Sequence, residues 1–265
     1  MNSLKRSFTL VEMLVVIAII GILAGILLPV LNSARARGHE TDCANNLRQI
    51  MMASIAYRQD YGGKRLPGWI SDIYGSYLKS KDVYRCAADM NDKNTPAENW
   101  KARNDDHWQE IYDRPGNVGI TYYPNPAVGN VSYFYEFPDA RCDWWHDKKE
   151  LIPSMDTSSV GTWFQVKTEQ LRKGKAVVDN DNNIVKNPDG TTKVTTYSPD
   201  KFPVIRCFWH VKNIEDYDAD LDNSFRKYWE TDISIPDNAE KVINVSFNGN
   251  VFYSTATWEN KTWSP

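Results

Sequence analysis

The sequence has no excess of positive charge and none of the familiar catalytic motifs. Its 31 Lys and Arg residues are outnumbered by 34 Asp and Glu residues, which gives a formal net charge of −3. Proteins that bind nucleic acid usually carry a basic face, so we expect no nucleic-acid partner. The chain also lacks Gly-x-Ser-x-Gly, His-Glu-x-x-His and phosphate-loop patterns, and its four histidines are scattered. The sequence therefore predicts no enzyme and no catalytic residue.

A second long apolar run is also missing, because the chain after about Ser33 is rich in polar residues. The single run extends from Phe8 to Leu31, and its 24 residues exceed the ~20 that a helix needs to span a bilayer. Lys5 and Arg6 precede it, which predicts a cytoplasmic N-terminus and a translocated head. A cleaved secretory signal would need a shorter apolar core, whereas a plain signal anchor remains an alternative.

Glu12 is the residue that a plain anchor does not explain. A carboxylate in a membrane helix costs ~2.5 kcal/mol or more at the bilayer centre, so it is usually paired. The apolar run contains no basic residue. Cleavage just before Phe8 would create an α-amine four residues from Glu12, on the same helical face and at the positive end of the helix dipole. The amine of the same subunit, or that of a neighbouring subunit, would then compensate the carboxylate.

The segment from Ser7 to Glu12 reads Ser-Phe-Thr-Leu-Val-Glu and resembles the processing site of type IV prepilins and type II secretion pseudopilins. The resemblance implies a leader of residues 1–7, which a prepilin peptidase removes between Ser7 and Phe8. It also implies N-methylation of Phe8 and a role for Glu12 in subunit assembly. Ser7 stands where the family usually has glycine.

The apolar helix contains two further features. Gly21-Ile-Leu-Ala-Gly25 is a Gly-x-x-x-Gly pattern, which allows close helix approach in membranes but is also common in ordinary membrane helices. Pro29 lacks a backbone N–H, so the carbonyl of Gly25 loses its usual partner. We expect a helix kink or local melting between Gly25 and Pro29, where the family has its helix-kinking proline.

Residues 32–61 are expected to continue the membrane helix as an amphipathic helix. Leu47, Ile50, Met51, Ser54 and Ile55 recur at helical spacing and predict the buried stripe, and the glycines at 62 and 63 predict the end of the helix.

Residues 62–265 are expected to form an extracytoplasmic, β-rich head. The fold class is therefore α+β: a long N-terminal helix, half transmembrane and half amphipathic, packed on an antiparallel sheet as in pilins. Short runs of β-branched and aromatic residues between turn-formers predict the strands: Val118–Tyr123, Val131–Phe137, Ala176–Asp179, Val194–Tyr197, Phe202–Val211, Val242–Phe247 and Asn250–Thr255. Asn248-Gly249 predicts a two-residue type I′ hairpin.

Parts of the chain also resemble a subfamily of pilin-like proteins abundant in planctomycete-type bacteria. Asp42 to Ile50 resembles its Cys-x-Asn-Asn-Leu-(Lys/Arg)-Gln stretch. That subfamily ends in a His, nine residues and an Asp-Gly pair. Asn238 and Asn248 occupy the positions of that His and Asp, so any shared role of the two residues is weakened here.

The four cysteines are Cys43, Cys86, Cys142 and Cys207. An even number in a translocated domain favours disulfides, and we favour Cys43–Cys86 and Cys142–Cys207 among the three connectivities. Zinc is disfavoured because no Cys-x-x-Cys pair exists, and buried thiols remain an alternative.

One acidic loop raises calcium as a possible cofactor, although we otherwise expect none. Its alternating carboxylates could offer oxygen ligands, but a solvated acidic loop explains them equally. The residues concerned are Asp216, Asp218, Asp220 and Asp222.

The sequence therefore predicts a structural subunit of a type II secretion pseudopilus or a type IV pilus-like fibre, anchored by one helix in the inner membrane. The expected partners are a prepilin peptidase, other pilin or pseudopilin subunits, an inner-membrane assembly platform and the lipid bilayer. The chain's ten Trp and fourteen Tyr residues leave an alternative, a membrane-anchored module that binds glycans or other ligands.

Overall fold

The structure is a computed structural model of the chain. It describes residues 10–63, 65–91, 95–96, 112–142, 161–177, 179, 183–210 and 242–254. The chain divides into two compact units, Met1–Thr41 and Asp42–Pro265, and the helix α1 (Leu10–Asp60) contributes to both.

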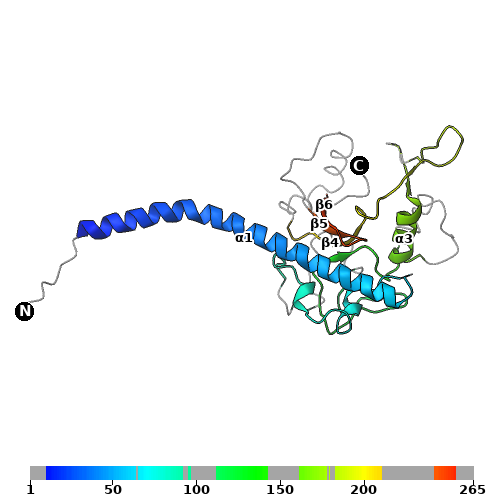
Figure 1. Ribbon diagram of the computed structural model, residues 1–265, viewed down its shortest axis with the longest axis horizontal. Coiled ribbons are helices and arrows are strands. Elements are labelled where there is room, and N and C mark those ends of the chain that lie inside the picture. The colour runs from blue at the N-terminus through cyan, green and yellow to red at the C-terminus, as the bar shows by residue number, and fades with distance from the viewer. Residues whose placement is uncertain are drawn as a thin grey trace, which may run out of the picture. The chain divides into compact units, whose positions relative to one another are not determined.

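In the first unit the backbone is helical from Leu10 onward, and the helix continues without a break through Gly25 and Pro29 (Figure 1). Local melting between these two residues is therefore not found in the isolated subunit, and a kink there stays a prediction. The apolar stretch of this helix is the one candidate membrane span in the described part of the chain, by its length and composition.

The C-terminal end of α1 lies where the sequence predicts it. Gly62 and Gly63 have φ angles of +71° and +75°, a left-handed conformation that glycine adopts without a Cβ penalty. The N–H of Gly63 donates to the carbonyl of Arg58 at 2.8 Å, which satisfies one of the helix's terminal acceptors.

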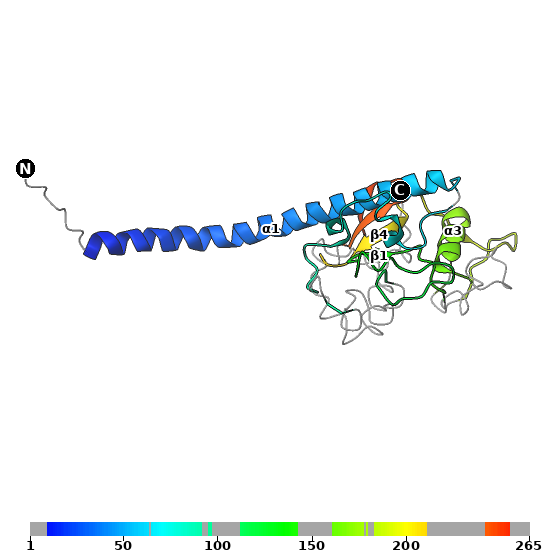
Figure 2. The same ribbon diagram turned by 90° about the horizontal axis from the view of Figure 1, so that it is seen from below.

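In the second unit the remaining part of α1 lies along a four-stranded antiparallel sheet (Figure 2). Leu47, Ile50, Met51 and Ser54 are buried as the sequence predicts, while Ile55 is half-buried. They pack with sheet residues such as Ile205 in one hydrophobic core. Burial of one face of an amphipathic helix supplies most of the stability that such a helix has in a folded domain.

The sheet has the order β1-β4-β5-β6, and every neighbouring pair is antiparallel. Its strands are β1 (Phe134–Tyr135), β4 (Pro203–Cys207), β5 (Val242–Ser246) and β6 (Val251–Ser254). β4 and β5 are buried along their whole length, and α1 shares a hydrophobic core with them. The predicted α+β pilin-like architecture is confirmed, with strands shorter than the sequence suggests.

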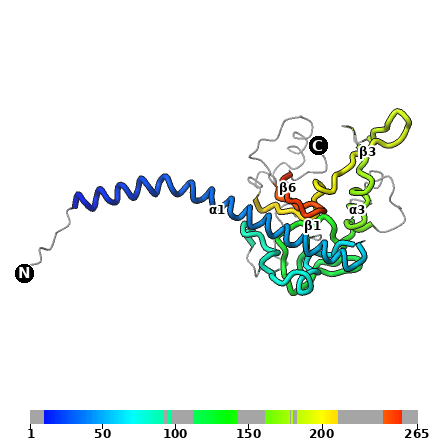
Figure 3. Tube along the Cα trace, viewed as in Figure 1, coloured from blue at the N-terminus to red at the C-terminus, as the bar shows by residue number. Residues whose placement is uncertain are grey.

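A smaller sheet pairs β2 (Lys175–Ala176) with β3 (Val194–Thr195), at the end of a helix that the sequence analysis missed. That helix is α3 (Trp163–Lys173). Its start carries a capping box, in which the Thr162 hydroxyl accepts from Gln165 N–H and the Gln165 amide accepts from Thr162 N–H. The sequence does contain a signal for this helix. Thr-x-x-Gln precedes an apolar residue at its start, and Gly174 follows its end. Figure 3 shows the chain path through these elements.

The predicted strand Val118–Tyr123 is wrong, because this segment is a loop. The buried Asp139 takes the place of a partner strand. Its carboxylate accepts from the N–H groups of Thr121 and Tyr122, and its carbonyl accepts from Ile120 N–H at 2.9 Å. Backbone donors satisfied in this way have no need of a sheet neighbour.

The hairpin at Asn248-Gly249 is confirmed, but its turn contains three residues and not two. β5 and β6 are closed by Ser246 N–H donating to the Asn250 carbonyl at 2.8 Å, and Gly249 N–H donates to the Ser246 carbonyl at 2.9 Å. Gly249 has φ +83°, the left-handed residue that three-residue hairpins place before the second strand.

The head buries the carboxylate of Asp113 next to Ser71. The side chain of Asp113 is fully buried, and Oδ2 accepts from Ser71 N–H at 2.7 Å. Oδ1 has no hydrogen-bond partner within the part of the chain that the structure describes. Burial raises the pKa of Asp113 to about 7, although the hydrogen bonds from Ser71 oppose this shift.

We predict that Asp113→Asn stabilises the head above neutral pH. A raised carboxyl pKa means that the folded state holds its proton while the unfolded state releases it, so stability falls as pH rises from about 4 to about 7. A carboxyl pKa of about 7 in place of the ordinary 3.8 lowers the free energy of unfolding at high pH by an amount on the order of 4 kcal/mol. Thermal unfolding of the full chain in detergent, followed by tryptophan fluorescence across this range, measures it.

The exposed Asp82 is the matched control, and Asp82→Asn should keep the pH dependence of the parent. A parent protein whose unfolding midpoint does not fall between mildly acidic and neutral pH would contradict this assignment, as would an Asp113→Asn variant with the parent's slope.

Candidate functional site

The first candidate site is the start of α1. Ser7 and Phe8, the residues of the expected cleavage and methylation site, lie outside the described residues. Glu12 lies in the first turn of α1, where the positive end of the helix dipole favours a carboxylate, and it is exposed. Glu12 therefore lies at the N-terminal end of the described apolar helix, and its role in assembly stays a prediction.

The apolar surface that follows Glu12 has no cover within its own unit. Every residue from Leu10 to Leu31 is exposed, and large side chains such as Ile22 and Ile26 expose about two thirds of their surface, at 66% and 65%. Monomeric soluble proteins rarely leave a contiguous apolar surface of this size open to water. A lipid bilayer or other apolar helices must therefore cover it.

The small residues of this helix lie on that same open surface. A Cβ built on Gly21 or Gly25 would meet no atom within 4 Å. Neither glycine is needed for packing within its own unit, so both remain available for close approach of another helix.

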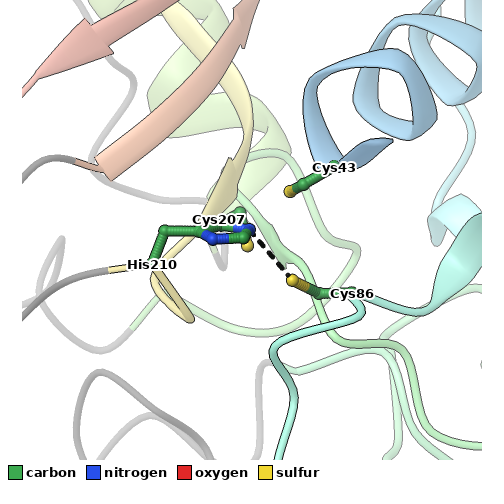
Figure 4. A group of neighbouring side chains, drawn as sticks. All are labelled: Cys43, Cys86, Cys207 and His210. Atoms are coloured by element: carbon green, nitrogen blue, oxygen red, sulfur yellow. Dashed lines mark hydrogen bonds between the residues drawn. The ribbon is translucent and has the colours of Figure 1, made fainter. Parts of the chain in front are cut away.

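The second candidate site is a group of three thiols and one imidazole in the head, shown in Figure 4. One ligand-type atom from each of Cys43, Cys86, Cys207 and His210 lies within 4.8 Å of all the others. Cys86 Sγ and His210 Nε2 lie 3.2 Å apart. The three cysteines are buried and His210 is half-buried.

The four residues come from three separate segments. Cys43 lies on α1, and Cys86 follows the 3-10 helix η2 (Asp82–Tyr84). Cys207 is the last residue of β4, and His210 lies in the turn directly after it. The packing of α1 on the sheet therefore brings them together.

Hydrogen bonds hold the segment around Cys86 in place. The carbonyl of Arg85 accepts from the Asn46 amide at 3.2 Å and from the Tyr133 hydroxyl at 3.1 Å, so it is tied to α1 and to the segment before β1. The N–H of Ala88 donates to Cys86 Sγ at 3.4 Å, and Asp89 N–H donates to the Cys86 carbonyl at 3.0 Å. This turn directs the sulfur toward the other two thiols.

The three thiols do not share the same acidity. Hydrogen bonds from Cys207 and Cys43, with a further contribution from His210, hold the pKa of Cys86 far below its usual range. Burial and the neighbouring sulfurs raise the pKa of Cys207 well above it. A hydrogen bond from Cys207 lowers the pKa of Cys43, but the hydrogen bond with Cys86 and burial outweigh it, so the net shift is upward. The arrangement favours negative charge on Cys86.

The favoured disulfides are not present in the structure. All four cysteines lie in the described part of the chain as thiols, and Cys207 lies with Cys43 and Cys86, not bonded to Cys142. His210, one of the four histidines that are scattered in the sequence, belongs to the cluster. The overlooked signal was the Cys-x-x-His spacing of Cys207 and His210.

Two predictions from the sequence, the calcium loop and the pair of Asn238 and Asn248, involve residues that the structure does not describe. Asp216, Asp218, Asp220 and Asp222 lie outside the described residues, so calcium binding there stays a prediction. Asn238 also lies outside them.

Asn248, at the position of the subfamily's Asp, lies in the β5–β6 turn. Its amide donates to Asp200 Oδ1 at 2.7 Å, and the Asn250 amide donates to the same oxygen at 3.1 Å. Asn248 therefore ties the hairpin to the segment before β4.

The comparisons with known proteins concern the N-terminal region. Residues 2–28 match the prokaryotic N-terminal methylation motif. A fimbrial protein of Neisseria meningitidis serogroup B is 34% identical over 89 residues, and the type IV major pilin protein PilE1 of Neisseria gonorrhoeae is 34% identical over 92 residues. Each alignment covers 31% of this chain, and 52% and 54% of the respective relative.

The chain therefore spans about half the length of the curated relatives it matches, and no solved structure matches it. The methylation motif, the apolar first half of α1 and the antiparallel sheet against its second half agree with one another. Together with the curated relatives, they make the N-terminal region of the chain similar to that of type IV pilins and support a type IV pilin-like family.

Proposed function

We propose that the chain is a structural subunit of a type II secretion pseudopilus or a type IV pilus-like fibre. A prepilin peptidase removes residues 1–7, and the subunit then enters a fibre through its N-terminal helix. The observation that supports this proposal best is the exposure of the whole segment from Leu10 to Leu31, with Glu12 as its one ionisable residue.

The lipid bilayer and a bundle of like helices would both remove the apolar side chains of this helix from water. In the bilayer and in a bundle of like helices its side chains are removed from water, so the hydrophobic effect does not favour one over the other. Close packing and polar contacts must therefore drive transfer from lipid into the fibre. Gly21 and Gly25 allow close packing, and Glu12 supplies the polar contact.

Glu12 becomes a docking group once the leader is removed. Before cleavage the apolar run has no cation, and cleavage before Phe8 creates one at the start of the helix. In our proposal the new amine of one subunit pairs with Glu12 of another, which relieves the cost of a carboxylate in an apolar surrounding. Processing and assembly are then coupled through one ion pair.

Localisation and partners follow from the same proposal. The uncut subunit waits in the inner membrane with its N-terminus in the cytoplasm, because Lys5 and Arg6 precede the span. Its partners are the prepilin peptidase, other pilin or pseudopilin subunits and an inner-membrane assembly platform.

No specific observation favours the alternative of a glycan-binding head. Among the tryptophans that the structure describes, Trp69 and Trp163 are buried and Trp209 is half-buried, with its indole N–H donating to the Ser132 carbonyl at 2.9 Å. A stacking platform for sugars would need several exposed aromatic faces side by side, whereas the exposed tyrosines that the structure describes, Tyr61, Tyr123 and Tyr253, come from three separate segments.

We predict that Glu12→Ala leaves processing intact and reduces fibre formation by ~10-fold or more, because the docking carboxylate is lost. Immunoblots of sheared fibre and membrane fractions measure the assembled share. Glu40→Ala, in the same helix beyond the apolar run, is the control and should assemble normally. Fibres at the parent level from the Glu12→Ala strain would contradict the proposal.

We further predict that the mature chain begins at methylated Phe8. Mass spectrometry of the N-terminal peptide from membrane-bound protein measures this directly. Ser7→Trp should leave the leader attached, because the peptidase needs a small residue before the cut, whereas Ser7→Gly should be processed. A mature parent chain that begins at any other residue would refute the site.

A further inference from the structure

We propose that Cys43, Cys86, Cys207 and His210 form a structural zinc site in the head of this protein. The inference starts from the chemistry of the cluster, since thiolates and imidazole are the ligands that structural zinc prefers. It is independent of the fibre proposal, because all four residues belong to the second unit and none lies in the apolar part of α1.

The distances within the cluster fit one ion. Tetrahedral zinc with Zn–S bonds of ~2.3 Å and a Zn–N bond of ~2.0 Å separates its ligand atoms by roughly 3.5 to 3.8 Å. The four atoms here all lie within 4.8 Å of one another, and Cys86 Sγ is 3.2 Å from His210 Nε2. Side-chain adjustments of about an ångström therefore suffice to reach tetrahedral ligation, without a change of backbone.

The ligand set selects among metals. Calcium and magnesium prefer oxygen ligands, which this cluster does not offer, whereas three sulfurs and one imidazole nitrogen match the Cys₃His class of zinc sites. Four protein ligands complete a tetrahedron and leave no position for substrate. The site is therefore structural and not catalytic.

Burial of the three sulfurs close together favours a bound cation over three protonated thiols. Cys43, Cys86 and Cys207 expose 1%, 4% and 0% of their surface, and three adjacent buried thiols make poor hydrogen-bond partners for one another. Zinc replaces the thiol protons, and the protons leave to solvent as the thiolates bind. The half-buried His210 lies at the edge of the cluster and offers the ion a route in from solvent.

The segment that carries Cys86 already holds the sulfur in place with a backbone hydrogen bond, as loops that ligate metals commonly do. The Ala88 N–H that donates to Cys86 Sγ would remain as a hydrogen bond to the bound thiolate, and such outer contacts orient metal ligands. On the other side, the Trp209 indole is held by the Ser132 carbonyl at 2.9 Å, which fixes the turn between Cys207 and His210.

The site would connect three parts of the head that are far apart in sequence. Zinc would tie α1 to the segment after η2 and to the end of β4, whereas a disulfide joins only two cysteines. It would thus join the two segments that a Cys43–Cys86 disulfide would join, and would also include β4. Cys142 is buried elsewhere, with its N–H donating to the Gly161 carbonyl at 2.9 Å.

Elemental analysis of the full chain tests the proposal. The protein is purified in detergent from membranes, with thiols protected from oxidation, and we expect one zinc per chain. Exchange for Co²⁺ should give the visible ligand-field bands and the near-ultraviolet thiolate charge-transfer band of a tetrahedral sulfur-rich site. Removal of zinc by a chelator should lower the thermal unfolding midpoint, because binding free energy of this kind contributes to folding.

Variants of His210 separate ligation from packing, because this residue is half-buried and its replacement is the least disruptive to the fold. In competition with a chromophoric chelator, His210→Ala should weaken zinc binding by at least ~100-fold, which exceeds the usual loss for an outer contact. His210→Cys supplies a fourth thiolate and should restore binding. Cys142→Ser, a buried cysteine outside the cluster, should leave the zinc content unchanged.

Four results would overturn the proposal. The reduced chain could fail to take up zinc, or it could carry another metal in its place. Mass spectrometry under denaturing conditions could find a Cys43–Cys86 disulfide in protein isolated with its thiols alkylated at once. His210→Ala could also bind zinc as tightly as the parent while Cys142→Ser does not. One zinc per chain, lost in His210→Ala and regained in His210→Cys, would support it.

Discussion

The structure depends on one helix whose two halves bury their apolar side chains in different ways. From Leu10 to Leu31 the helix is almost entirely apolar and every residue is exposed, so its surroundings must supply the cover. From Cys43 to Tyr57 only one face is apolar, and the head covers it. The same element therefore holds a candidate membrane span and a core helix, because its hydrophobic pattern changes along its length. In our proposal the first half is also the assembly surface.

The head is built around the second half of that helix. α1 forms one wall of the core, and the antiparallel sheet forms the other, with β4 and β5 at the centre. Cys43 and Cys207 lie on these two walls, so the thiol cluster is located at the contact between helix and sheet. A metal at that point would fix the helix to the sheet where the core begins, next to the boundary between the two units at Thr41.

The sequence predicted the features that depend on local pattern. The buried stripe of α1, its glycine stop and most strands were found from spacing and turn chemistry alone. Features that need long-range contacts were missed. The buried ion cluster of Glu136 with Lys167 and Arg206, at 2.9 and 3.1 Å, joins residues up to 70 positions apart. The thiol cluster likewise required β4 to meet α1, and the Cys-x-x-His spacing of Cys207 and His210 indicates only two of its four members.

The central claim is that neighbouring subunits cover the exposed apolar helix. A photo-crosslinking residue at Ile22, which exposes 66% of its surface, tests it most directly when membrane and fibre fractions are irradiated separately. Our account predicts crosslinks to further copies of the chain or to other pilin-like subunits in the fibre fraction, and mainly lipid adducts in the membrane fraction. Fibres whose Ile22 probe captures no other subunit would contradict it.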